Sequence, residues 1–97
     1  MEIAGTDLAG VVVVTPRRFG DERGWFSEVW NKARMEAAGL AFDWVQDNHS
    51  WSAQAGTIRG LHFQTPPFAQ DKLVRVARGR VLDVAVDLRA SSPTYGR

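Results

Sequence analysis

The sequence predicts an antiparallel all-β sandwich or barrel with one short helix. Short β-branched or alternating runs recur along the chain, turn residues separate them, and a single segment has the composition of a helix. The 97 residues suffice for one small domain, and no linker, repeat or low-complexity tract divides them. We therefore expect residues 1–97 to form a single domain, of a class that can hold a small ligand in its mouth.

The stretch after the first ten residues predicts two strands and a turn region between them. Val11–Val14 is a β-branched run typical of a strand, and the glycines and acidic residues of residues 17–24 predict a tight connection. The next six residues, WFSEVW, alternate in side-chain direction if they form a strand. Phe26 and Glu28 should then share one face of this second strand.

The segment NKARMEAAGL, residues 31–40, predicts the helix. Asn31 can cap its start, because an asparagine side chain accepts a hydrogen bond from an N–H group of the first turn. Alanine, arginine, methionine and glutamate favour the interior, and Gly39 suits the position just past the end.

The middle of the chain predicts two further strands and a loop. Residues 42–51 alternate, which puts the amides of Gln46 and Asn48 on one face. Buried amides need partners, so this face should reach solvent or line a polar cavity. Residues 57–64 predict a return strand, whereas two prolines exclude residues 65–71 from the centre of a sheet.

Residues 72–89 predict a hairpin about Arg78-Gly79, since glycine accepts the positive φ of a tight turn. With a two-residue loop, Lys72 and Asp83 become diagonal neighbours on one face, within reach of each other's side chains. That juxtaposition depends on the register and fails if the turn is one residue longer. The opposite face is an apolar packing layer, made of Leu73, Leu82, Val84, Val86 and Leu88.

Composition excludes several classes of protein. The net charge is +1 without a basic stripe, which argues against a nucleic-acid binder. There is no cysteine, and the two histidines lie far apart in the sequence, so we expect no metal site. The start has neither a basic leader nor a long apolar run, so we expect a cytoplasmic protein that does not enter the membrane.

Three stretches carry a resemblance to a known family: FGDERGWFSEVWN, VQDNHSWS and GTIRGLHFQTPPFAQDKLVRVARGRVLDVAVDLRASSPTYGR. In order and spacing they are similar to the dTDP-4-dehydrorhamnose 3,5-epimerase family, from about Val11 to Arg97. The resemblance implies a cupin-like jelly roll (double-stranded β-helix), here its N-terminal part. Family members are longer, and the family's tyrosine acid and the aspartate that pairs with its histidine are expected beyond Arg97. Tyr95 matches a loop and not that acid.

The resemblance implies an isomerase of dTDP-L-rhamnose biosynthesis that needs no cofactor. It would epimerise C3 and C5 of dTDP-4-dehydro-6-deoxy-D-glucose to give dTDP-4-dehydro-L-rhamnose, removing protons made acidic by the C4 ketone. His62 matches the base, since a neutral imidazole accepts a proton at pH 7. Lys72 matches a pocket lysine that would stabilise the enolate, and Asp83 would hold its ammonium group. Alternatively, Lys72 is an ordinary surface lysine. Asp83 could equally form an ordinary ion pair with a neighbouring arginine.

The resemblance also implies a set of substrate-binding residues. Two arginines match positions that bind the nucleotide diphosphate, for which a planar guanidinium is suited. An aromatic ring can stack on thymine, and a carboxylate and two amides match other parts of the pocket. Asp47 points the opposite way by alternation and is included only through its backbone. The set is Arg23, Phe26, Glu28, Gln46, Asp47, Asn48 and Arg59.

One conflict within this set predicts a local irregularity. Strict alternation places Arg59 and His62 on opposite faces of their strand. Both can face one cavity only if the strand bends or bulges, and Gly60 is the natural place.

Two alternative functions stay open: an epimerase that acts on a single carbon of a dTDP-4-keto sugar, and a non-catalytic β domain that binds a sugar nucleotide. The family resemblance further implies a homodimer, and the four-valine run offers a strand edge that can seek a partner.

Overall fold

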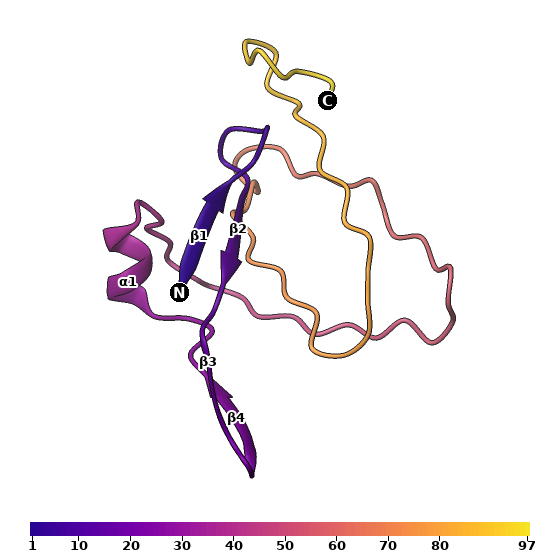
Figure 1. Cartoon of the computed structure of the whole chain (residues 1–97). Helices are drawn as coiled ribbons and strands as arrows, with labels where there is room; N and C mark the ends of the chain where they lie inside the picture. Colours follow the sequence, from indigo (N-terminus) through magenta and orange to yellow (C-terminus); the bar gives the residue numbers. More distant parts are fainter.

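The computed structural model describes residues 1–97 as two small antiparallel sheets, one helix and a long irregular course (Figure 1). The regular structure is strands plus one short helix, as the all-β class requires. The elements, in chain order, are β1 (Glu2–Gly5), β2 (Val12–Thr15), β3 (Arg18–Asp21), β4 (Gly24–Ser27) and α1 (Lys32–Ala37).

The first sheet pairs β1 with β2, and Ile3 lies opposite Val14. The strand predicted at the valine run is confirmed as β2, shifted by one residue. Its partner β1 was not predicted, because the short segment EIAG mixes polar, apolar and glycine residues. Thr6 closes the connecting loop: its hydroxyl donates to the carbonyl of Val11 at 2.8 Å and accepts from the N–H of Leu8 at 3.2 Å.

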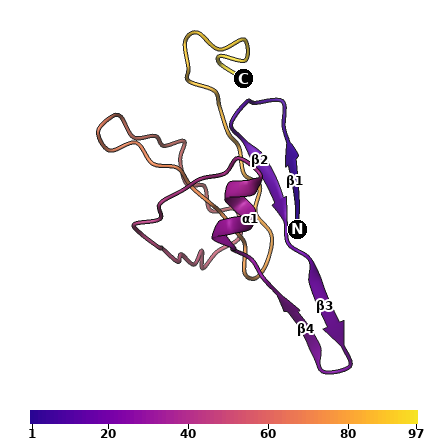
Figure 2. The ribbon, with the colours of Figure 1, turned by 90° about the vertical axis from the view of Figure 1, so that its left-hand side faces the viewer.

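The second sheet is a hairpin of β3 and β4 that projects away from the rest of the chain (Figures 1 and 2). The prediction of a tight connection over residues 17–24 is therefore wrong in extent: the turn proper is only Glu22-Arg23, and β3 precedes it. Charged and apolar residues are both exposed on this arm, so β3 lacks the alternation that marks a half-buried strand. Strand β4 is confirmed but ends at Ser27.

The helix is confirmed, with both of its predicted ends. The side chain of Asn31 accepts a hydrogen bond from the N–H of Arg34 at 3.0 Å, and Gly39 adopts a φ of +84° just past the end. Met35 faces inward and is 1% exposed. Next to the helix in sequence, the ring of Trp44 lies edge-to-face with that of Trp30, with centroids 5.3 Å apart, and tilted against that of Phe42, with centroids 4.8 Å apart.

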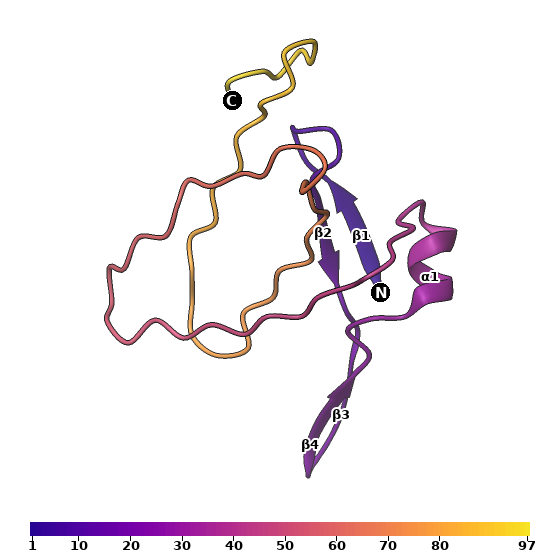
Figure 3. The same cartoon turned by 180° about the vertical axis from the view of Figure 1, so that it is seen from behind.

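From residue 40 onward the backbone makes no strand pairs, and it follows a wide course on the other side of β1–β2 from α1 (Figure 3). The strands predicted at residues 42–51 and 57–64 and the hairpin over residues 72–89 are thus wrong for this chain. The bend around Gly79, with φ +93°, and the turn closed by the Phe68 N–H on the Thr65 carbonyl match the prediction. A strand needs a neighbour to bond with, and residues 1–97 place none beside these segments.

The predicted apolar packing layer is consequently uncovered. Leu82 is 91% exposed, and the other four members of the layer are exposed as well. Met35 and Asp87 are the only buried residues of the chain. The structure contains no helix with the length and hydropathy that crossing a bilayer would require.

Candidate functional site

The tip of the β3–β4 hairpin brings two of the predicted binding residues together. A hollow of about 270 Å³ is lined by Phe19, Asp21, Arg23, Gly24, Trp25 and Phe26. Phe26 is 73% exposed and lies directly opposite Phe19 in the register, so the two rings share one face of the hairpin. An exposed aromatic pair beside a guanidinium group can bind a flat ring that carries an anionic group.

Arg23 is held in place by its own turn. Its guanidinium lies 2.8 Å from a carboxylate oxygen of Asp21, and its backbone N–H donates to the same carboxylate at 2.8 Å. These two contacts keep the pKa of Asp21 below its usual value. An anionic ligand at Arg23 must compete with Asp21, a residue that the sequence reasoning did not single out.

The other face of the hairpin carries a second arginine–aromatic contact. The guanidinium of Arg18 lies 4.1 Å from the ring centroid of Trp25. On the face of Phe19 and Phe26, the guanidinium of Arg17 lies 5.0 Å from the ring centroid of Phe19. These distances are typical of cation–π contacts. The side chains of Arg17 and Arg18, which are neighbours in the sequence, therefore both contact aromatic rings.

Three further predicted binding residues have local partners. Glu28 lies past the end of β4, 3.6 Å from the guanidinium of Arg34 at the helix. The amide of Gln46 donates to that of Asn48 at 3.1 Å, so these two side chains do share a side of the backbone. Asp47 makes no hydrogen bond or ion pair, and its role stays a prediction.

Around Gly60 the structure confirms the predicted irregularity. Gly60 has a φ of +105°, a conformation that other residues rarely adopt. Before it, the guanidinium of Arg59 donates to the Trp51 carbonyl and to the Ser52 hydroxyl, both at 3.2 Å. After it, the ring of His62 folds back toward Gly60, with Nδ1 3.1 Å from the position that a Cβ at residue 60 would occupy.

No hydrogen bond or ion pair joins any two of the three predicted catalytic side chains, His62, Lys72 and Asp83. Lys72 and Asp83 are both exposed, and neither makes a hydrogen bond or an ion pair. The hairpin that would bring them together is not paired, so their juxtaposition stays a prediction. No three carboxylate or imidazole groups lie close enough to form a metal site.

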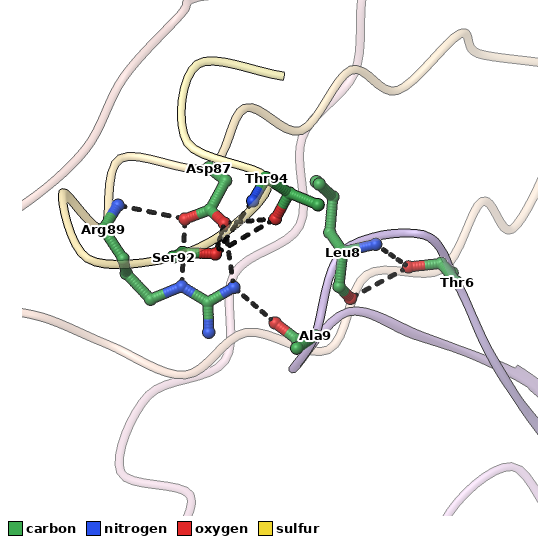
Figure 4. A network of polar contacts seen from close by, with 7 residues as sticks. All are labelled: Thr6, Leu8, Ala9, Asp87, Arg89, Ser92 and Thr94. Carbon is green, nitrogen blue, oxygen red and sulfur yellow. Dashed lines mark hydrogen bonds and ion pairs between the residues drawn. The ribbon is translucent and has the colours of Figure 1, made fainter.

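The most connected polar group is Asp87, which the sequence analysis did not single out (Figure 4). Its side chain is 1% exposed and accepts hydrogen bonds from the Arg89 Nε at 2.9 Å, from the Thr94 hydroxyl at 2.6 Å and from the Ser92 hydroxyl. The Arg89 guanidinium, followed by the two hydroxyls, holds the pKa of Asp87 far below its usual range. We call these four residues the Asp87 cluster.

The Asp87 cluster also joins distant parts of the chain. Arg89 donates to the carbonyl of Ala9, in the loop between β1 and β2, at 2.8 Å (Figure 4). A hollow of about 300 Å³ lies between this loop and residues 85–89. The signal that could have found the cluster is an aspartate followed within seven residues by an arginine, a serine and a threonine.

Comparisons with known proteins agree with one another. A family model described as dTDP-4-dehydrorhamnose 3,5-epimerase matches residues 5–97. The dTDP-4-dehydrorhamnose 3,5-epimerase of Sinorhizobium fredii is 54% identical over 101 residues, covering 100% of this chain and 50% of that protein. That of Escherichia coli K12 is 46% identical and covers 100% of this chain and 52% of that protein. The chain thus spans about half the length of the curated relatives it matches.

A solved structure is similar over nearly the whole chain. The crystal structure of the dTDP-4-dehydrorhamnose 3,5-epimerase of Bacillus anthracis, with TDP and PPi bound, superimposes with a TM-score of 0.94 at 49% identity. The match covers 99% of this chain and 55% of that one. The open course of residues 40–97 therefore has a close counterpart in a crystal structure that is considerably longer.

Proposed function

Because this chain belongs to the dTDP-4-dehydrorhamnose 3,5-epimerase family, we propose that the protein carrying it epimerises C3 and C5 of dTDP-4-dehydro-6-deoxy-D-glucose. The product would be dTDP-4-dehydro-L-rhamnose, an intermediate of dTDP-L-rhamnose biosynthesis. The observation that carries the proposal is the likeness along 99% of the chain to an epimerase that binds TDP. The 97 residues correspond to about half of such a protein, so the activity is proposed for the whole and not for this part.

We propose that the whole protein is a cupin-like jelly roll, to which this chain contributes the N-terminal part. Unpaired extended segments and an uncovered apolar layer support this, because both become stable only against further strands. In such a fold, residues 72–77 and 80–88 would gain strand partners. Lys72 and Asp83 would then be fixed in position.

In the proposed reaction His62 is the base. It takes a proton from the carbon beside the C4 ketone, and the electron pair of the broken C–H bond moves to the C4 oxygen as an enolate. Lys72, held by Asp83, stabilises that negative charge more than the neutral ketone, which lowers the barrier. An acid on the opposite face returns a proton to carbon, so the configuration inverts and the ketone is restored.

The hairpin hollow supports a role for Arg23 and Phe26 in binding the nucleotide. There the aromatic pair would stack on thymine while Arg23 leaves Asp21 for a phosphate oxygen. Arg59, Glu28, Gln46, Asn48 and, through its backbone, Asp47 complete the proposed binding set.

We also infer a homodimer. In β2, Val12 and Val13 are exposed, and the two-stranded sheet leaves free edges that can accept a strand from a second copy. Light scattering on the purified protein should give twice the chain mass, and a monomeric mass would contradict this. A cytoplasmic location stays a prediction from the sequence.

Hydrogen–deuterium exchange tests the function. The protein carrying this chain is incubated with dTDP-4-dehydro-6-deoxy-D-glucose in D₂O, and proton signals at C3 and C5 are followed by NMR. Loss of both signals is expected. Loss of one would favour a single-carbon epimerase, and loss of neither would favour a domain that only binds the nucleotide sugar.

Two variants assign the base. His62→Gln should reduce exchange at both carbons by at least about 10²-fold, the contribution typical of a positioned base. His49→Gln, which changes the other histidine, serves as the matched control and should exchange at the wild-type rate. Equal rates in the two variants would remove His62 from its proposed role.

A further inference from the structure

We propose that Gly60 is a positioning residue for His62, because the imidazole crowds the space in which the Cβ of any side chain at residue 60 would lie. This inference rests on the proposed role of His62 as the base. It adds that the turn before His62 requires a glycine at residue 60, which is a separate question from which residue is the base.

The contacts around Gly60 come from His62 alone. A Cβ built on Gly60 would lie 3.1 Å from Nδ1, 3.3 Å from the backbone nitrogen and 3.5 Å from Cε1 of His62. At 3.1 Å a carbon and a ring atom are closer than packed side chains normally approach, since contacts between non-bonded atoms are best near 3.5–4.0 Å. A methyl group there is crowded unless the imidazole ring gives way by a few tenths of an ångström.

The backbone conformation at residue 60 also favours glycine. Its φ of +105° disfavours every residue with a Cβ. Gly56 and Gly79 also have positive φ, +81° and +93°, but a Cβ at either would meet nothing within 4 Å. Of these three glycines, Gly60 alone combines a positive φ with a crowded Cβ position. A comparison with Gly56 or Gly79 therefore separates the effect of the crowding on His62 from the effect of backbone strain.

The contacts also orient the ring. The edge formed by Nδ1 and Cε1 faces Gly60, which leaves Nε2 and Cδ2 on the side away from it. Arg59 leaves the same turn in a different direction, toward Trp51 and Ser52. The turn at Gly60 therefore sets where the imidazole lies, and a displacement of about 1 Å of a reacting group can cost about 10²-fold in rate.

The test compares Gly60→Ala with Gly56→Ala in the protein that carries this chain. Both variants place a Cβ at a positive φ, and only the first one crowds His62. Gly60→Ala should lower the exchange rate at C3 and C5, and kcat, by up to about 10²-fold, the cost of a displacement of about 1 Å. The affinity for TDP should fall less than kcat does, because Arg59, next to this turn, is only one of several residues proposed to bind the nucleotide. Gly56→Ala should keep both rate and affinity.

An NMR measurement gives a readout that does not depend on turnover. In the wild-type protein, a nuclear Overhauser effect between the Gly60 α-protons and the His62 ring proton on Cε1 is expected. Its absence would overturn the inference even if Gly60→Ala does not fold. Equal exchange rates in Gly60→Ala and Gly56→Ala would overturn it too, whereas an inactive wild-type protein that still shows the Overhauser effect would contradict the proposed function and not the packing.

Discussion

Shortening Met35 to alanine should lower the free energy of unfolding by about 2–3 kcal/mol. Met35 is 1% exposed, so its whole side chain is removed from water on folding. Returning a buried side chain of this size to water costs about 1.5–3 kcal/mol, and the space left behind adds a further cost. That addition should be small here, because Met35 is the only buried apolar residue and its exposed surroundings can collapse into the gap.

The measurement is urea unfolding of the protein that carries this chain, followed by tryptophan fluorescence, since Trp30 and Trp44 contact each other edge-to-face near the helix in sequence. Met35→Leu keeps the volume and should cost less than about 1.5 kcal/mol. Lys32→Ala is the control on the same helix: it removes an exposed ion pair to Glu36 and should change stability by less than about 0.5 kcal/mol. If Met35→Ala is no more destabilising than Lys32→Ala, the helix does not pack as the structure places it.

Three further predictions concern the helix cap, the Asp87 cluster and the hairpin tip. Asn31→Ala should cost about 1 kcal/mol of unfolding free energy, and Asn31→Ser should recover most of it, because serine also caps. The folded-state pKa of Asp87 lies below its unfolded value of about 3.9, so the cluster stabilises fully above that pH and loses its contribution as the pH falls below it. The stability difference between wild type and Asp87→Asn, from unfolding curves, should therefore be constant above about pH 5 and shrink below about pH 4; a constant difference down to pH 2 would contradict the cluster. Arg23→Ala should weaken TDP binding, measured by calorimetry, about tenfold or more, and by less at high salt. Arg78→Ala is the control and should leave the affinity unchanged. Equal affinities of the two variants would exclude the hairpin hollow as part of the nucleotide site.

Local features of the fold follow from the sequence with good accuracy. The helix, its asparagine cap and its terminal glycine depend on a few neighbouring residues, and all three are confirmed. The break at Gly60 was predicted from a conflict between two side chains on one strand, and it is present. Strand β3 was missed because an arm exposed on both faces needs no alternation of polar and apolar residues.

The candidate site follows from the sequence only in part. Arg23 with Phe26, and Gln46 with Asn48, are close in sequence, and the structure brings each pair together. The juxtaposition of Lys72 and Asp83 depends on the register of a hairpin whose strands are unpaired in residues 1–97, so it stays a prediction. The Asp87 cluster was missed because its partners lie on a turn that returns to the aspartate, which alternation along a strand does not describe.

The sequence by itself determined the family, the helix with its two ends, the glycine break before His62 and the residue types available for proton transfer. Only the tertiary structure decided which carboxylate is buried, that Arg89 reaches the Ala9 carbonyl, and that the segments after residue 40 are unpaired. The physical reason is the distance along the sequence over which each interaction acts. Caps and turns are set by interactions over three or four residues, whereas strand pairing and burial need a second surface that must come from a distant part of a polypeptide.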